Sequence, residues 1–173
     1  MPNLKTMAEF GPGLLATLWK HRGDVSYKLG LNVPLRTAFT VDFWELKERG
    51  LVFNPLLYFI TEGLIGDGIF TFTSISSFFA SHKFHKVFYQ VDPQFATAAR
   101  PAYTADSGYL STTISQGFSK SLFKDTNMFI GVNYTTLKGN ANRRSPLLKK
   151  DYNLAAAIGF VWWFYESASR EKL

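Results

Sequence analysis

The most constraining feature of the sequence is a strict alternation of residue types over residues 26–41. The polar side of this segment carries Lys28, Asn32 and Arg36. The other side is predominantly apolar, with Tyr27, Leu29, Leu31, Val33, Leu35, Thr37 and Phe39. Because successive side chains of a β-strand point to opposite faces, this period of two predicts a strand with one apolar and one polar face.

Six further segments show strand-like composition and are bounded by turn residues. Together with the first, they predict seven strands, over residues 7–20, 26–41, 51–63, 68–80, 108–123, 127–138 and 153–165. The last segment repeats the two-faced pattern, because Leu154, Ile158 and Phe160 share one face. In the chain of 173 residues we predict one domain over residues 1–164, followed by a tail over 165–173.

Apolar residues are interleaved with polar ones along the whole chain. Aromatic residues make up 17% of the sequence and charged residues 18%, but no run of about 18 apolar residues offers a membrane-spanning helix. A closed barrel is the other structure that pairs every backbone polar group within a bilayer. The absence of cysteine is compatible with passage through an oxidising periplasm. We therefore predict an all-β, antiparallel, up-and-down transmembrane β-barrel.

The connections between the predicted strands alternate in length. Short and long links follow one another in strict order, at residues 21–24, 42–50, 65–68, 81–107, 124–126 and 139–152. Outer-membrane barrels show this rhythm, because their periplasmic turns are short and their outer loops are long. The long links are therefore expected on the outer side of the membrane.

The expected number of strands follows from this orientation. If the long loops are outside, the last strand ends in the periplasm and the first begins outside. An odd number of further strands is then expected upstream, for a total of about eight to twelve. Residues 1–5 carry no secretory signal, which we also expect upstream. An alternative count arises if the 81–107 region holds an extra strand, for which Phe84 to Val91 is the candidate.

Charged residues on the predicted strands are expected to face the barrel lumen. A Lys or Arg that faces lipid costs about 2–4 kcal/mol at the bilayer midplane, which favours an inward direction. The predicted lumen-facing residues are Lys28, Asn32, Arg36, Glu9 and Glu62. They are compatible with a small pore or with a structural network of ion pairs, and we favour a plugged or narrow lumen.

Two groups of residues are expected at the rims of the membrane. Aromatic side chains form girdles at the level of the head groups. We predict such girdles from Trp162, Trp163 and Phe164 on the periplasmic side and from Phe78, Phe79 and Tyr89 on the outer side. The candidates for contact with lipopolysaccharide phosphates are the cations of the last long loop, Arg143, Arg144, Lys149 and Lys150. The alternative is a solvated loop with incidental charge.

No catalytic, cofactor-binding or metal-binding constellation is recognised, and the chain is not expected to be an enzyme. His82 or His85 beside Ser76 or Ser77 would suggest a hydrolase acting on lipid A. A surface position at the membrane rim is the favoured interpretation of both histidines. The net charge of +6 makes nucleic-acid binding a further candidate function. The cations gather in predicted turns and loops and not on an aromatic face, which argues against it.

Several short motifs lie in a fixed order along nearly the whole chain. The first are Glu9-Phe10-Gly11-Pro12 and Leu35-Arg36. The central ones are Tyr89-Gln90-Val91-Asp92-Pro93, Ala96, Arg100-Pro101-Ala102-Tyr103 and Gly108. The last are Tyr134-Thr135-Thr136-Leu137-Lys138-Gly139-Asn140-Ala141, Ser145-Pro146-Leu147-Leu148 and a final strand that ends on Phe164. This ordered set resembles the MltA-interacting protein family, MipA/OmpV. The departures are the missing leading strands and the nine residues after Phe164.

The resemblance implies a protein of the Gram-negative outer membrane that is linked to peptidoglycan synthesis and hydrolysis. It implies a non-enzymatic scaffold whose partners are a lytic transglycosylase and a penicillin-binding protein, in contact with outer-membrane lipid and lipopolysaccharide. It implies no catalytic residue and no cofactor. The alternatives are a small outer-membrane pore or transporter and a surface adhesin or antigen.

Overall fold

The structure, a computed structural model, describes residues 6–42 and 45–164. Within these ranges the chain forms a single antiparallel sheet, a short helix, α1 (His82–Tyr89), and a 3-10 turn, η1 (Pro93–Phe95). The strands are β1 (Thr6–Phe10), β2 (Gly13–His21), β3 (Ser26–Asp42), β4 (Glu45–Phe53), β5 (Leu56–Glu62), β6 (Ile69–Ala80), β7 (Gly108–Phe123), β8 (Thr126–Thr136) and β9 (Tyr152–Trp162). The all-β, antiparallel prediction is confirmed, whereas the predicted tail lies outside the described residues.

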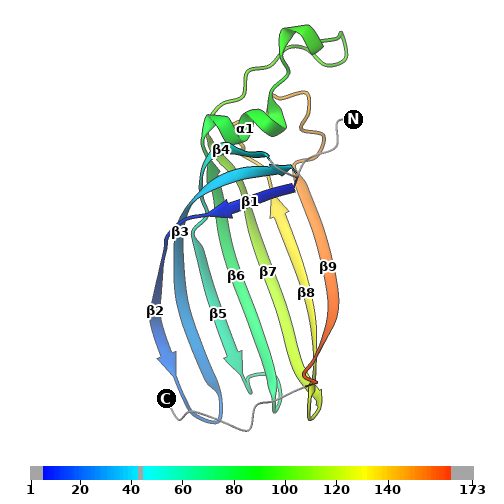
Figure 1. Ribbon diagram of the computed structural model, residues 1–173. Coiled ribbons are helices and arrows are strands. Elements are labelled where there is room, and N and C mark those ends of the chain that lie inside the picture. Colours follow the sequence, from blue (N-terminus) through cyan, green and yellow to red (C-terminus); the bar gives the residue numbers. More distant parts are fainter. Residues whose placement is uncertain (1–5, 43–44, 165–173) are drawn as a thin grey trace.

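The sheet is curved, and its strands follow one another up and down (Figure 1). Short turns lie at one end, and α1 and the long loops lie at the other. Within the described ranges β9 pairs only with β8, and β1 and β2 pair only with β3, so these strands are the two edges of the sheet. Among the same residues, no helix has the length and apolar character needed to cross a membrane.

The first and third predicted strands are each divided into two by a proline. β1 and β2 are separated at Gly11–Pro12, and β4 and β5 at Asn54–Pro55, but all four lie along β3. Proline has no N–H to give to the ladder, so each break falls where a strand omits a bond. Each of the seven predicted segments therefore contains strand, but β4 overlaps its predicted segment only at residues 51–53.

A third proline lies at the same level of the sheet. Pro34 of β3 is paired with Gly13, which follows Pro12, and Leu35 is paired with Phe53, two residues before Pro55. Three neighbouring strands thus carry a proline along one line, which we call the proline line. Beyond it, β1, β4 and the end of β3 turn across the long-loop end (Figure 1).

The predicted long link over residues 42–50 is wrong. β4 begins at Glu45, and Asp42 of β3 is its direct register partner, with only residues 43–44, which are not described, between the two strands. The charged composition of residues 45–49 suggested a loop. It is explained by the place of β4 at the mouth of the sheet, where its side chains are largely exposed to solvent.

The two faces of the sheet differ in what covers them. α1 packs on the face that carries Ala38 and Val52, and we call this the inner face. Strand alternation places Arg36 on the same face. The outer face exposes large apolar side chains, including Ile114, Ile130 and Ile158, which are 49%, 45% and 63% exposed. An apolar surface of this extent is typical of a surface that contacts lipid or protein.

Candidate functional site

Helix α1 closes the long-loop end of the inner face. Phe84 and Phe88 are four residues apart and therefore lie on one side of the helix, with ring centroids 5.2 Å apart. Phe84 is 6% exposed and packs into a cluster of Ala38, Val52 and Ala80. The alternative of an extra strand between Phe84 and Val91 is wrong. Its alternating aromatic residues fit a strand, but they form the apolar side of a helix.

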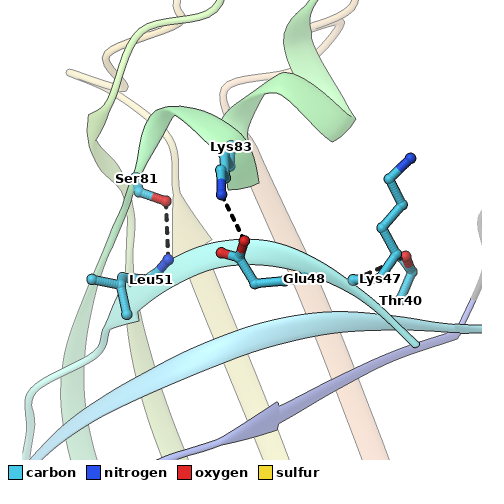
Figure 2. A network of polar contacts seen from close by, with 6 residues as sticks. All are labelled: Thr40, Lys47, Glu48, Leu51, Ser81 and Lys83. Carbon is cyan, nitrogen blue, oxygen red and sulfur yellow. Dashed lines mark hydrogen bonds and ion pairs between the residues drawn. The ribbon is translucent and has the colours of Figure 1, made fainter.

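Polar contacts fasten the start of α1 to β4. Lys83 Nζ lies 2.6 Å from Glu48 Oε2, and the Leu51 N–H donates to Ser81 Oγ at 3.0 Å (Figure 2). Gly50 lies between these two β4 residues with φ of +98°, and a Cβ there would lie 2.1 Å from Ser81 Oγ. Only glycine suits both the conformation and the space. The helix is therefore docked at a place that its own sequence and that of β4 both specify.

Helix α1 and the loops over residues 102–110 and 137–148 form a set of buried polar contacts that we call the loop cluster. His85 lies at its centre and is fully buried. Its Nδ1 accepts a hydrogen bond from Asn142 Nδ2 at 2.9 Å, and its Nε2 donates to the Gly108 carbonyl at 3.1 Å. These partners assign a neutral ring with the proton on Nε2. Burial lowers the pKa of His85 from its ordinary value of 6.5, against the opposing effects of the Gly108 carbonyl and Asp106.

The predicted surface position of His85 is therefore wrong, because the loops fold over this residue. His82, by contrast, is exposed, and its Nδ1 lies 2.7 Å from the Ala105 carbonyl oxygen.

Asn142 joins three segments that are far apart in sequence. Its Nδ2 donates to His85 and to the Asp106 carbonyl at 2.9 Å, while its Oδ1 accepts from the Asp106 N–H at 2.7 Å and from Tyr103 Oη at 3.3 Å. Asn142 is 0% exposed. Because a buried amide is costly unless its groups are bonded, this side chain fixes the loops in one arrangement.

A second layer of the same cluster surrounds Tyr89. Asn140 Nδ2 donates to Tyr89 Oη at 3.1 Å and to the Leu110 carbonyl at 2.9 Å, and Ser145 Oγ donates to the Tyr89 carbonyl at 2.7 Å. Tyr89 is only 7% exposed, and burial raises its pKa. Its predicted place in an outer aromatic girdle is wrong, because its hydroxyl is used inside the loops.

The structure brings two of the predicted lumen residues together beneath α1. Arg36 Nε lies 3.3 Å from Glu9 Oε2, and both side chains are about one-third exposed or less. The contact is an ion pair without hydrogen-bond geometry. A cavity of about 320 Å³ is lined by Glu9, Phe78, Phe84, Phe88, Tyr89 and Leu110. Its lining is thus mainly apolar and aromatic, and the one charged lining residue, Glu9, is paired with Arg36.

The other predicted lumen residues are not gathered into that ion pair. Lys28 Nζ lies 5.8 Å from the Tyr58 ring centroid, within reach of a cation–π contact. Asn32 is partly buried on the same strand. Glu62 lies toward the short turns, where Ser26 Oγ donates to it at 3.5 Å. Whether these side chains line a lumen stays a prediction.

The four predicted lipopolysaccharide-contacting cations lie around one open cavity of about 810 Å³. Its lining residues are Leu137, Lys138, Gly139, Arg143, Arg144, Leu148, Lys149, Lys150, Asp151 and Tyr152. The lining therefore contains five cationic residues and one acidic residue, Asp151. The contact with lipopolysaccharide stays a prediction.

The aromatic residues predicted for the rims fall into two groups. Trp162, Trp163 and Phe164 follow one another beside the short turn at residues 124–126 and are 68%, 61% and 85% exposed, and Phe79 is 37% exposed. Their place in a girdle stays a prediction. The placement of Phe78 in the outer girdle is wrong, because its ring packs 5.5 Å from that of Phe84 in the cluster below α1.

The histidines and serines weighed for a hydrolase do not form a pair. Both ring nitrogens of His85 bond to Asn142 and Gly108, and Ser77 Oγ lies 2.9 Å from Thr112 Oγ1. In the described part of the chain, no group of three or more His, Asp or Glu residues is placed to hold a metal ion.

Sequence reasoning missed the buried amides, Asn140 and Asn142, as members of a site. Nothing in their local pattern distinguishes them from ordinary loop asparagines. The available signal was the ordered motif set, because Asn140 and Ser145 belong to two of its motifs.

Comparison with known proteins gave one match. The family model described as MltA-interacting protein MipA matches residues 1–164. No curated protein and no solved structure matches the chain.

Proposed function

Because the chain belongs to the MltA-interacting protein MipA family, we propose that it is a non-enzymatic outer-membrane scaffold of the peptidoglycan machinery. The family is associated with the Gram-negative outer membrane and with murein synthesis, and its name records an interaction with the lytic transglycosylase MltA. The match over residues 1–164 is the observation that carries the proposal. A penicillin-binding protein is the second proposed partner.

The form of the long-loop end supports the scaffold in preference to an open channel. α1 packs on the inner face, and buried hydrogen bonds from Asn142 and Asn140 hold the loops closed over it. A long-loop end that is held closed by such bonds fits a protein that presents its surfaces to partners. The exposed apolar outer face suits a place in lipid.

The short-turn end offers the surface for a periplasmic partner. Leu64 and Ile65 stand at the tip of a short turn and are 57% and 54% exposed. Neighbouring apolar residues that are this exposed are typical of contact surfaces. In the proposed orientation this end faces the periplasm, where peptidoglycan enzymes act.

Surface plasmon resonance on the full-length protein in nanodiscs tests the proposal. We expect binding of the purified lytic transglycosylase, of the bifunctional penicillin-binding protein, or of both. The double substitution Leu64→Ser with Ile65→Ser should weaken this binding about tenfold or more, as for a small apolar hot spot. The control, Phe95→Ser with Leu147→Ser, alters two exposed apolar residues of the long loops and should leave binding unchanged.

Absence of binding to either enzyme by a folded protein would overturn the scaffold. Equal effects of both variants would overturn the assignment of the short-turn surface.

The cavity beneath α1, with its Glu9–Arg36 pair, is the observation that favours a pore as the second candidate. Planar-bilayer recording separates the two. A scaffold with a closed mouth is expected to be electrically silent, and steady single-channel conductance by the wild-type protein would favour the pore.

A further inference from the structure

We propose that the loop between β8 and β9 binds the phosphates of an outer-leaflet lipid whose acyl chains lie against the outer face of the same two strands. The orientation of the sheet is taken from the proposed function, to which this inference adds a ligand class and a site. The ligand is a lipid with two or more phosphates, as in lipid A.

The charge around the cavity defines the kind of ligand. Lys138, Arg143, Arg144, Lys149 and Lys150 line an open volume of about 810 Å³ that contains only one acidic lining residue, Asp151. Guanidinium groups bind phosphate through two parallel hydrogen bonds, and lysines add point charges. Two adjacent arginines and two adjacent lysines suit a ligand with more than one phosphate.

The loop that carries these cations is held at both its ends and its middle. The Leu137 N–H donates to the Asp151 carbonyl at 2.7 Å and closes the neck of the loop. Between these residues, Asn140, Asn142 and Ser145 are 2%, 0% and 4% exposed and bond into the α1 cluster. The backbone beneath the cations is therefore ordered before a ligand arrives, which reduces the entropy lost on binding.

An apolar stripe begins where the basic cavity ends. Tyr152 lines the cavity and lies on the same side of β9 as Leu154, Ile158 and Phe160, which are 69%, 63% and 62% exposed. The register pairs Tyr134 with Leu154, so β8 widens the stripe with a further exposed ring.

Charge and apolar surface are thus continuous on one side of the sheet. A soluble polyanion would leave the stripe in water, whereas a phosphorylated lipid covers both parts.

Lipid retention by the full-length protein provides the test. The protein is reconstituted in phosphatidylcholine nanodiscs that contain bisphosphorylated lipid A, and the lipid kept after detergent extraction is counted by native mass spectrometry. We expect the wild-type protein to retain bisphosphorylated lipid A and not its dephosphorylated counterpart. The variant Arg143→Gln, Arg144→Gln, Lys149→Gln and Lys150→Gln should retain about tenfold less, the sum expected for several exposed ion pairs.

A control variant removes the same charge at the opposite end of the sheet. It carries Lys20→Gln, Arg22→Gln, Lys120→Gln and Lys124→Gln, all at exposed positions, and should retain lipid A as the wild type does. Equal loss in the two variants, or equal retention of phosphorylated and dephosphorylated lipid, would overturn the proposal. Displacement of the lipid by inorganic phosphate at a similar concentration would do the same, because it would identify a simple anion site. None of these outcomes depends on enzyme binding, so the scaffold is tested separately.

Discussion

Strands β1–β9, which we call the strand wall, and the loop cluster are held in place by different kinds of interaction. In the wall, continuous backbone ladders pair the strands, and large outer side chains such as Ile114 and Ile158 remain exposed. In the loop cluster, single polar side chains are buried and bonded, above all His85 and Asn142. The wall therefore depends on residue class, whereas the cluster depends on particular residues. Substitutions should affect the two regions very differently.

Asn142→Ala should have the largest effect. It leaves the His85 ring, the Asp106 backbone and the Tyr103 hydroxyl without this buried partner, and each unsatisfied group costs about 1–3 kcal/mol. We expect the loop cluster to lose roughly 3 kcal/mol or more. Hydrogen exchange of residues 102–110 and 137–148 measures this loss. Asn153→Ala, at an exposed position of β9, is the control, and equal protection in both variants would contradict the role of Asn142.

Gly30→Ala should have the next largest effect, because Gly30 is one of the positions in the wall where a particular residue is required. Gly30 of β3 is the register partner of Tyr58 on β5, and the Tyr58 side chain is only 8% exposed. A Cβ at Gly30 would lie 2.3 Å from the Tyr58 ring. Overpacking of this kind costs about 1–3 kcal/mol. Gly131→Ala, where the nearest atom would be 3.5 Å away, should be tolerated. Urea unfolding in detergent compares the two, and equal midpoints would mean that Tyr58 moves aside freely.

Acidification should loosen the cluster and leave the wall unchanged. The folded loops hold His85 neutral with a lowered pKa, so the opened loops bind more protons at mildly acidic pH. Stability of the cluster is therefore complete above about pH 6.5. It falls as the pH drops from there toward the lowered folded pKa. The rate of loop proteolysis between pH 7.5 and 5.5 reports this change.

His85→Gln is the matched control for the pH experiment. Its amide oxygen and N–H resemble the acceptor and donor of the ring but do not titrate. A wild-type profile that matched that of His85→Gln would show that His85 does not govern the pH response.

Lys83→Gln should have the smallest effect. Its ion pair with Glu48 is short, at 2.6 Å, but the two side chains are 67% and 43% exposed. Exposed pairs are screened and contribute little. We expect a slight rise in the exchange rate of α1 amides at low salt and no difference from wild type in 0.5 M salt. A large effect that persisted at high salt would show that α1 depends on this pair more than on Phe84.

The same contrast explains what the sequence could predict. Alternation over residues 26–41 and 153–165 predicted the strands β3 and β9, because the wall repeats one pattern at every second residue. It could not predict β4, because the charged residues 45–49 are typical of a loop but pair with the end of β3. It could not predict α1 either, because the aromatic residues of this segment fit the repeat of a strand as well as that of a helix. It also could not distinguish a buried histidine from a surface one, since the partners of His85 lie 23 and 57 residues away.

The proline line has a mechanical consequence. Pro12, Pro34 and Pro55 each remove a donor from one level of three neighbouring strands, which weakens the sheet along a crease. Beyond the crease, β4 reaches β6 through only two register pairs, Val52–Ala80 and Phe53–Phe79. The strands beyond the crease are thus joined to the lower sheet mainly through the unbroken backbone of β3. Packing of Phe84 against Ala38, Val52 and Ala80 supplies a side-chain contact across the same region, so we expect force applied at α1 to act first on this upper part of the sheet.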